Sequence, residues 1–361
     1  MGTLSRAFVT GATGFVGYHL VSALLRRGVA VRALVRPRSP ASDLVSLYDA
    51  RREAPCATIA EAAARSECVV GDLADTQVLS DGISGCDTVY HVAADYRLWA
   101  RDPSAMYRTN VEGTMNVLHA AEEAGAARIV YTSTVGTLGI PADGSPGTED
   151  TPVRLEDMVG HYKRSKFVAE ASARAYAGER GLNLVVVYPS TPVGERDKRP
   201  TPTGRIVVDF LKGRLPAYVD TGLNLVDVRD VAEGHILAAE RGAPGRGYIL
   251  GNTNLTLRDV LAELAAVTGE PAPTVRIPYW CAFAFAVADT LWSGCVCGRE
   301  PRASLDAVRM ARKCMFFDSS RAVRELQMPQ SPIRPALRRS AEWFVAHGYC
   351  APRTALAGGQ A

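Results

Sequence analysis

The amino-acid sequence predicts an α/β fold, a doubly wound parallel β-sheet with helices on both faces and a smaller C-terminal part. Strand candidates and helix candidates alternate along the chain, which is the pattern of a parallel sheet. A glycine-rich turn joins the first strand candidate to the first helix candidate. The 361 residues are also enough to bury a sizeable core.

The turn contains Gly11, Gly14 and Gly17, between a strand candidate at residues 6–10 and a helix candidate at residues 19–27. In such a unit the first glycine permits the turn, the second lets the backbone approach a pyrophosphate, and the third allows close helix–strand packing. The phosphates rest on the helix N-terminus, where free N–H groups and the dipole favour anions. A turn without a ligand is the alternative. The predicted Rossmann-type dinucleotide contacts are Gly11, Thr13, Gly14, Phe15, Val16 and Gly17.

Tyr162 and Lys166 are four residues apart in a later helix candidate, so their side chains share one face. A phenol titrates near pH ~10, and a nearby ammonium favours its ionised form. Tyr162 would then exchange a proton with a substrate hydroxyl while a nicotinamide takes or gives a hydride. A surface helix bearing a Tyr and a Lys is the alternative, and the upstream glycine turn favours the catalytic interpretation.

In this order along the chain, the glycine turn and the Tyr–Lys helix resemble the extended short-chain dehydrogenase/reductases, and the resemblance covers essentially the whole chain. It implies a Rossmann domain over residues 1–190, to which some later segments return, and a mainly substrate-binding part over residues 191–350. Residues 351–361 are expected to be a disordered tail. An insertion at about residues 49–66, between the second and third strands, is expected to form an extra surface helix.

The resemblance also implies a hydroxyl that positions the substrate oxygen, at the end of the strand before the catalytic helix. That strand candidate covers residues 128–133, and the matching position is Thr134, where the family usually has a serine. A threonine hydroxyl makes the same hydrogen bonds. Ser133 is the alternative, but its side chain points to the other side if the strand continues. The expected catalytic group is therefore Thr134, Tyr162 and Lys166.

The end of the second strand candidate, residues 29–35, indicates which dinucleotide binds. An acidic residue there would bond the ribose hydroxyls of NAD, whereas an arginine binds the 2′-phosphate of NADP. The chain has Arg36 and no acid at this place. NADP is therefore the preferred cofactor and NAD the second choice, with a solvated loop charge as the alternative for Arg36.

The remaining cofactor contacts follow from the resemblance alone. They are Asp72 and Leu73 after the third strand at the adenine, Ala93 and Ala94 beneath the cofactor, Asn110 interrupting a helix and orienting the lysine through solvent, and Pro189 and Thr191 after the sixth strand at the nicotinamide. His91 lies inside the fourth strand candidate and is interpreted as a packed core histidine.

Composition excludes other classes of protein. The net charge of +3 is small and no basic tract occurs, so nucleic acid is not an expected partner. The eight cysteines are scattered without the paired spacing of a zinc site, so no metal is expected. Without a charged-then-apolar leader the protein is expected in the cytoplasm. The apolar residues 277–296 are interrupted by Asp289, which favours a helix of the substrate part over a transmembrane span. Peripheral contact with a membrane and cover over an apolar ligand are the two roles left open for this helix.

Several longer runs resemble a narrower group, the bacterial hopanoid-associated sugar epimerases, which are close to dihydroflavonol-4-reductase-like proteins. These runs cover residues 91–100, 160–166, 189–194, 200–205, 310–313 and 315–317. The resemblance implies an NAD(P)-dependent epimerase or oxidoreductase acting on a sugar or polyol linked to an isoprenoid (hopanoid) lipid. An NADPH-dependent ketone or aldehyde reductase of the dihydroflavonol-4-reductase type is the alternative. A non-catalytic NAD(P)-binding regulatory protein is the third hypothesis.

Two further reactions of the wider family are disfavoured. A dehydratase of this family carries an Asp–Glu pair directly after the catalytic hydroxyl, where this chain has Val135 and Gly136. A nucleotide-sugar epimerase holds the diphosphate with an arginine just ahead of the segment matching residues 226–230. Residues 222–225 stand there and contain no arginine.

Candidate substrate contacts lie close to the cofactor site. An aromatic wall, or alternatively the packed seam between the two parts, is expected from Tyr96, Leu98, Trp99, Phe316 and Phe317. Arg205 is the candidate polar contact, so the predicted substrate residues are Tyr96, Trp99 and Arg205. By resemblance, helices at residues 104–123 and 158–176 are expected to form the interface of a homodimer.

Overall fold

The computed structural model describes residues 5–37, 57–97, 99, 102–296 and 305–350. Its centre is a seven-stranded sheet in the order β10-β6-β5-β4-β1-β2-β3, and every neighbouring pair is parallel. The strands are β1 (Arg6–Thr10), β2 (Ala30–Val35), β3 (Glu67–Val70), β4 (Thr88–His91), β5 (Arg128–Thr132), β6 (Leu184–Pro189) and β10 (Gly247–Leu250). The expected doubly wound parallel sheet is confirmed.

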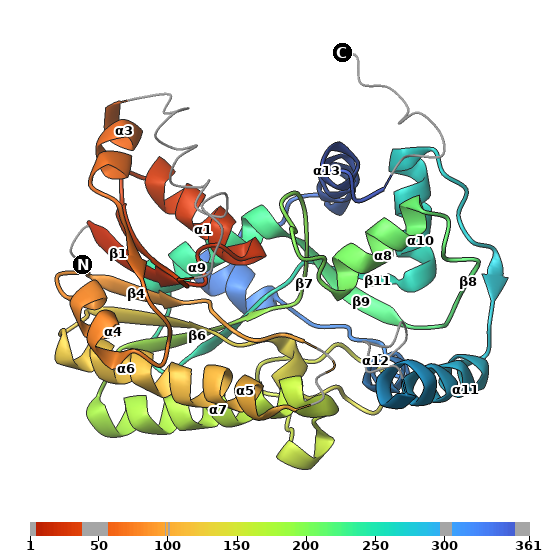
Figure 1. Cartoon of the computed structure of the whole chain (residues 1–361), viewed down its shortest axis with the longest axis horizontal. Helices are drawn as coiled ribbons and strands as arrows, with labels where there is room; N and C mark the ends of the chain where they lie inside the picture. Colours follow the sequence, from red (N-terminus) through yellow and green to blue (C-terminus); the bar gives the residue numbers. More distant parts are fainter. Residues whose placement is uncertain (1–4, 38–56, 98, 100–101, 297–304, 351–361) are drawn as a thin grey trace.

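Helices cover both faces of this sheet, as Figure 1 shows. One layer packs α1 (Phe15–Arg26), α3 (Ala57–Ala64), α9 (Val228–Arg241) and the π-helix η6 (Ala322–Leu326) into a common core. The other contains α4 (Thr76–Ile83), α6 (Gly113–Glu123) and α7 (Gly160–Arg180). Because both faces are covered, a strand such as β6 is apolar and buried along its whole length.

The order of the strands places a crevice at the carboxyl end of β1. The chain continues from β1 to β2 and β3 on one side and then crosses to β4 on the other side of β1. Ligands of doubly wound sheets bind where the strand order reverses in this way. The glycine turn between β1 and α1 lies at this position.

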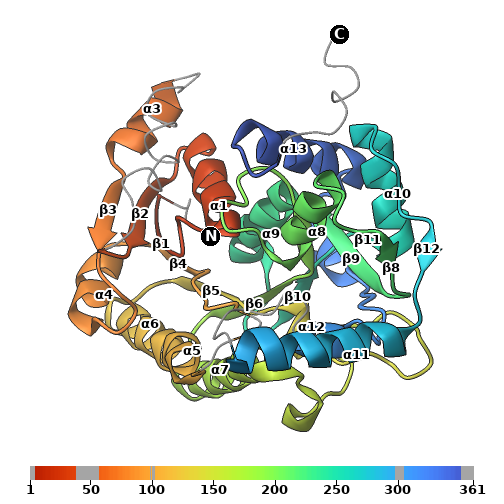
Figure 2. The ribbon, with the colours of Figure 1, turned by 45° about the vertical axis from the view of Figure 1, so that its right-hand side comes forward.

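A smaller part adjoins the carboxyl ends of the strands (Figures 1 and 2). Its sheet has the order β11-β9-β7, with β7 (Thr191–Val193), β9 (Gly222–Asp227) and β11 (Thr253–Thr256). The helices α8 (Pro202–Leu211), α10 (Leu257–Thr268) and α13 (Ile333–Ala346) bury apolar faces together with this sheet. A two-stranded ribbon, β8 (Ala217–Tyr218) and β12 (Val275–Arg276), leads into α11 (Tyr279–Asp289), the π-helix η5 (Thr290–Val296) and α12 (Leu305–Met310).

Some expected elements differ from the observed ones. The expected helix at residues 104–123 is divided into α5 (Ser104–Tyr107), the π-helix η2 (Arg108–Glu112) and α6. The helix of the expected insertion begins at Ala57, and residues 49–56 lie outside the described residues, as does the expected tail at 351–361. The insertion is not only a surface feature, because Ala62 and Ala63 are fully buried in the core beside α1. Within the described chain, no helix is both long and apolar enough to span a bilayer.

Candidate active site

The glycine turn has the geometry of a phosphate cradle. Gly11 has φ of +70°, in the left-handed region that favours glycine. Gly14 donates its N–H to the Gly11 carbonyl at 2.9 Å. A Cβ on Gly17 would lie 2.1 Å from the same carbonyl oxygen, so a side chain there would clash with backbone. The three glycines therefore hold the turn directly against the first residues of α1.

The first turn of α1 presents free backbone donors. Its N-cap, Gly14, makes no side-chain capping bond, and the first turn carries no acidic side chain. Thr13, Phe15 and Val16 lie around this helix start and are partly buried. Unpaired N–H groups at the positive end of a helix are a ready anion site. These residues fit the pyrophosphate of a dinucleotide.

The residues predicted for the adenosine end follow neighbouring strands. Arg36 is exposed directly after β2, and Asp72 is exposed two residues after β3. Leu73 is buried, and its carbonyl accepts a hydrogen bond from Asn116 at 2.9 Å. Ala93 follows β4 and donates its N–H to Thr10 Oγ1 at 3.1 Å. The structure thus brings these residues to one edge of the sheet, together with the partly buried Ala94.

His91 is a core residue, as its position in the fourth strand predicts. Its Nδ1 is bonded to Thr10 Oγ1 at 2.8 Å and its Nε2 to Thr114 Oγ1 at 2.9 Å. Burial, followed by the nearby Lys166 charge, lowers the pKa of His91 to about 3, so the ring is neutral. Its role is to join β1, β4 and α6 beneath the crevice.

The predicted catalytic side chains meet where β5 ends. Thr134 caps the short 3-10 helix η3 (Val135–Thr137), accepting a hydrogen bond from Gly136 N–H at 3.1 Å. Tyr162, in the first turn of α7, lies near the Thr134 side chain, which favours the ionised form of its phenol. One turn later, Lys166 Nζ donates to the carbonyl of Thr132 at 2.7 Å. Helical spacing from α7 and the strand end of β5 therefore bring the three groups together.

Burial controls the protonation of this group. It raises the pKa of Tyr162 to about 12, and the hydrogen bond with Thr134 opposes this shift only in part. Burial lowers the pKa of Lys166 to about 7, against the opposing charge of Glu170. The expected lowering of the phenol pKa by the lysine is wrong, because Lys166 Nζ is directed to Thr132 O and lies 4.4 Å from the centre of the Tyr131 ring.

Asn110 lies in the π-helix η2, so the predicted helix interruption is present. Its side chain is buried, accepts the Asp95 N–H at 2.8 Å and donates to the Asp95 carbonyl at 3.0 Å. It also donates to Ser165 Oγ at 2.9 Å, next in sequence to Lys166. Asn110 therefore fixes the segment after β4 to the catalytic helix.

Ser133 points away from Tyr162, into a network around Glu170 that sequence reasoning missed. Ser133 Oγ donates to Glu170 Oε2 at 2.7 Å, and Arg174 Nε donates to Oε1 at 2.9 Å. The Tyr188 hydroxyl donates to the same carboxylate. Only one signal was available, since Glu170 follows Lys166 by four residues on the same helix face. Of the two candidate hydroxyls, Thr134 is the one beside the phenol.

At the predicted nicotinamide end, the chain passes from the large sheet to the small one. β6 ends at the buried Pro189, and β7 begins at the partly buried Thr191. Between them, Ser190 has a buried hydroxyl without a hydrogen-bond partner among the described residues. An unsatisfied buried hydroxyl at this position fits a polar ligand group.

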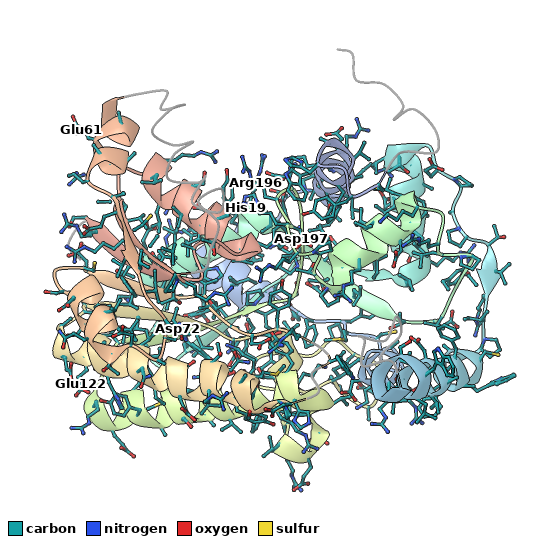
Figure 3. All side chains as sticks on the ribbon, in the orientation of Figure 1. His19, Glu61, Asp72, Glu122, Arg196 and Asp197 are labelled. Carbon is teal, nitrogen blue, oxygen red and sulfur yellow. The ribbon has the colours of Figure 1, made fainter. Side chains whose placement is uncertain are left out.

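The loop after β7 packs against α1. Figure 3 shows His19 of α1 close to Arg196 and Asp197 of this loop. His19 Nε2 donates to the Glu195 carbonyl at 3.0 Å. The Arg196 guanidinium lies 4.3 Å from the centre of the Tyr18 ring. Burial raises the pKa of Asp197 to about 6, and Thr201 opposes this shift by donating its N–H and hydroxyl to the carboxylate.

Tyr96, which follows β4, contacts the loop after β7, and the charge of the exposed Arg205 on α8 acts on both Tyr96 and Asp197. The Tyr96 hydroxyl donates to the Arg199 carbonyl at 3.2 Å. Burial raises the pKa of Tyr96, with smaller effects from the charges of Asp197, Arg199 and Arg205. Tyr96 in turn acts on the pKa of Tyr162, so it lies near the catalytic phenol.

The other aromatic candidates have different environments. Trp99 is partly buried, and Leu98 lies outside the described residues. Phe317 is 2% exposed and packs in the core, which supports the alternative of a packed seam for this residue. The Phe316 ring fills the space beside Gly222, where a Cβ would lie 2.3 Å from Cε1.

Comparisons with known proteins agree with this geometry. The model of the NAD dependent epimerase/dehydratase family matches residues 7–251. A "Putative dihydroflavonol 4-reductase" from Synechocystis sp. is 44% identical over 95% of both chains. "Sterol demethylase protein B" from Methylococcus capsulatus is 33% identical over 94% of this chain and 98% of its own. The crystal structure of gox2253 is similar with a TM-score of 0.81 and 42% identity, covering 96% of this chain and 99% of that one.

The fold, the glycine turn and the matched family model agree along most of the chain. This protein therefore belongs to the NAD dependent epimerase/dehydratase family, and it is an NAD(P)-dependent enzyme of the extended short-chain dehydrogenase/reductase type.

Proposed function

We propose that the protein is an NAD(P)-dependent epimerase or oxidoreductase that acts on a sugar or polyol linked to an isoprenoid (hopanoid) lipid. The observation that carries this proposal is the contact between Thr134 and Tyr162 at the end of β5, with Lys166 one turn further along α7. A nicotinamide dinucleotide held by the glycine turn would supply hydride transfer at the substrate carbon. Thr134 holds the substrate oxygen, and Tyr162 Oη exchanges its proton.

The surroundings of Gly222 support a substrate other than a nucleotide sugar. The expected arginine ahead of residues 226–230 is missing. The Phe316 ring leaves no room for a side chain at Gly222. The Asn224 side-chain amide donates hydrogen bonds to the Phe317 carbonyl at 3.2 Å and to Asn254 Oδ1 at 2.8 Å. Residues 222–225 themselves therefore supply no cation for a diphosphate.

An exposed apolar stripe supports a lipid substrate and a peripheral membrane contact. Along α11 and η5 the exposed fractions are 70% for Trp280, 58% for Phe285, 58% for Leu291 and 68% for Trp292. Their helical spacing places them on one face, with a tryptophan toward each end, as in helices that lie in a membrane interface. The adjoining α12 segment carries exposed arginines, Arg309 and Arg312, which complement anionic lipid. Figure 2 shows α11 along the outer edge of the smaller part.

Replacing both Trp280 and Trp292 with serine is expected to lower binding to vesicles containing anionic phospholipid by about tenfold or more. Each substitution removes the apolar surface that a tryptophan would bury in the membrane interface. Co-sedimentation with vesicles measures this. Val323→Ser removes an exposed apolar side chain on η6 and serves as the control. Equal vesicle binding by the double variant and the wild type would contradict membrane contact by α11.

Retention or release of the bound cofactor distinguishes an epimerase from a reductase. An epimerase keeps its nucleotide through the cycle, whereas a reductase releases it in every turnover. The purified protein is denatured, the released nucleotide is identified, and the emptied protein is titrated with NADP(H) and NAD(H). We expect retained NADP(H), and we expect Arg36→Ala to weaken NADP(H) binding about tenfold while NAD(H) binding is unchanged, because Arg36 is assigned to the 2′-phosphate. An empty protein that exchanges cofactor freely would instead support a reductase.

The second candidate is an NADPH-dependent ketone or aldehyde reductase, and the name of the Synechocystis relative favours it. The name of the relative "Sterol demethylase protein B" is compatible with a polycyclic isoprenoid substrate for this protein. A non-catalytic regulatory protein is the least supported hypothesis, because Thr134 and Tyr162 are in contact.

We also propose a homodimer through α6 and α7. These helices pack side by side on one face of the large sheet, and Figure 1 shows them on its outer side. His119 and Tyr176 join them by a ring contact of 4.7 Å between centroids. By resemblance, such a helix pair meets its copy in a four-helix interface.

A further inference from the structure

Glu170 is a carboxylate close to the catalytic group for which the proposed reaction has no use. It lies on α7 at helical spacing from the catalytic residues, one turn after Lys166 and two turns after Tyr162. Its side chain is only 12% exposed. A charge removed from water in this way is costly unless hydrogen bonds compensate it. The hydrogen-bond partners of Glu170 therefore show what the carboxylate holds in place.

One oxygen of the carboxylate contacts the two hydroxyls that flank Thr134. Ser133 Oγ donates to Glu170 Oε2 at 2.7 Å. Thr137 Oγ1 lies 3.2 Å from the same oxygen and 2.8 Å from the Thr134 carbonyl, within hydrogen-bond distance of both. The Thr137 N–H also donates to the Thr134 carbonyl, at 3.0 Å. Glu170 therefore holds the chain on both sides of the residue assigned to the substrate oxygen.

The other oxygen of the carboxylate is held from the opposite side. Arg174 Nε donates to Glu170 Oε1 at 2.9 Å, and the Tyr188 hydroxyl donates to the same oxygen. Arg174 lies one turn further along α7, and Tyr188 lies on β6. Because both oxygens are engaged, the carboxylate cannot rotate without losing bonds to η3, α7 or β6. It is a fixed point between these three elements.

The first turn of α7 packs against η3 as well. A Cβ on Gly136, inside η3, would lie 3.3 Å from Lys163 Cε and 3.4 Å from Thr134 Oγ1. Lys163 is the next residue after Tyr162, so this contact joins the catalytic turn of α7 to the turn that follows Thr134. A shift of η3 against α7 would therefore change the distance between Thr134 and Tyr162.

We propose that Glu170 is a positioning residue, which sets through Ser133 and Thr137 where the Thr134 hydroxyl lies relative to the Tyr162 phenol. The inference rests on the proposed function, because it concerns the same reacting groups. One helix then carries both the phenol and the carboxylate that places its hydroxyl partner, and the helical spacing keeps the two in register. In this role Glu170 acts through the two flanking hydroxyls and exchanges no proton.

The test titrates the Tyr162 phenol by the ultraviolet absorbance of tyrosinate, with and without added NADP⁺. Subtracting the spectrum of the same protein carrying Tyr162→Phe isolates this tyrosine. The double variant Ser133→Ala with Thr137→Val removes both hydroxyls and leaves every charge in place. Thr137→Ser keeps the hydroxyl and is the conservative variant. Thr268→Val on α10 is the control, since it removes a buried hydroxyl that donates to the Leu264 carbonyl at 2.7 Å.

We expect the double variant to raise the pKa of the Tyr162 phenol by about one unit, because a hydrogen bond from Thr134 favours the ionised phenol. Thr137→Ser and Thr268→Val should titrate like the wild type. In a Glu170→Gln background the two hydroxyl substitutions should add little, since both hydroxyls act through the same carboxylate. A crystal structure of the double variant should show Thr134 Oγ1 displaced from its wild-type position.

An unchanged phenol pKa in the double variant, an equal rise in Thr268→Val, or Thr134 at its wild-type position in the crystal would overturn the inference. Where the phenol titrates beyond the range in which the protein stays folded, the position of Thr134 decides alone. If the double variant does not fold, Thr137→Val is compared with Thr137→Ser by the same two measurements. Failure of the proposed function is a separate result, because hydride transfer would be absent while the displacement of Thr134 persists.

Discussion

Tyr162→Phe should lower kcat by about 10²–10⁴-fold, the range that a positioned general acid or base contributes. The variant loses only the phenolic hydroxyl beside the Thr134 side chain, and the ring stays in the first turn of α7. Steady-state kinetics measures the effect. Circular dichroism and thermal unfolding show whether the fold is intact.

The matched control is Tyr176→Phe on the same helix. The Tyr176 hydroxyl donates to Glu122 on α6, far along α7 from the catalytic turn. Its removal should leave kcat within about twofold of wild type, because the lost bond with Glu122 is far along α7 from Thr134 and Lys166. If Tyr162→Phe kept more than a tenth of the wild-type kcat, the acid–base role of Tyr162 would be wrong.

The pH dependence of the wild-type oxidation and reduction rates is a second test of the acid–base role of Tyr162. Burial raises the pKa of Tyr162 to about 12, so the phenol is protonated near neutral pH and the phenolate fraction grows as the pH rises. Oxidation of an alcohol needs the phenolate as base, and reduction of a ketone needs the protonated phenol as acid. We therefore expect the oxidation rate to rise with pH and the reduction rate to fall at high pH.

The second large effect is expected at Gly17. A Cβ there would lie 2.1 Å from the Gly11 oxygen and 2.7 Å from the Gly11 carbonyl carbon, and both contacts are with backbone. Either α1 moves away from the turn or the turn opens, so Gly17→Ala should cost about 1–3 kcal/mol of stability. The same displacement removes the phosphate cradle, and the affinity for NADP(H) should fall at least about tenfold.

Gly178→Ala is the control for this variant. Gly178 lies inside α7, and a Cβ there would meet nothing within 4 Å. Alanine is the better helix former by about 1 kcal/mol, so this change should raise the melting temperature and leave NADP(H) binding unaltered. Wild-type NADP(H) affinity in Gly17→Ala would show that the turn does not hold the dinucleotide.

The backbone of the glycine turn and the helix that carries Tyr162 were predictable from the sequence. The glycine turn is a local signal, since Gly11 and Gly17 are needed by the backbone of one strand–turn–helix unit. Tyr162 and Lys166 share a helix face because of their spacing alone. The buried strands are visible as mainly apolar runs, because a parallel sheet covered on both faces favours apolar residues.

The substrate side was less predictable. Phe316 and Phe317 are adjacent and chemically identical, yet Phe317 packs in the core and Phe316 fills the space beside Gly222. Ser133 and Thr134 are also adjacent hydroxyls, and the packing of α7 directs one to Glu170 and the other to Tyr162. No local pattern distinguishes such neighbours, because their partners lie on other segments.

The sequence by itself determined the α/β class, the parallel sheet, the dinucleotide turn and the Tyr–Lys helix, because each depends on residues within a few positions of one another. Only the tertiary structure decided the raised pKa of Tyr162 and the exposed face of α11. Burial and charge depend on which distant segments pack together. A protonation state or an exposed apolar face is therefore a property of the folded chain.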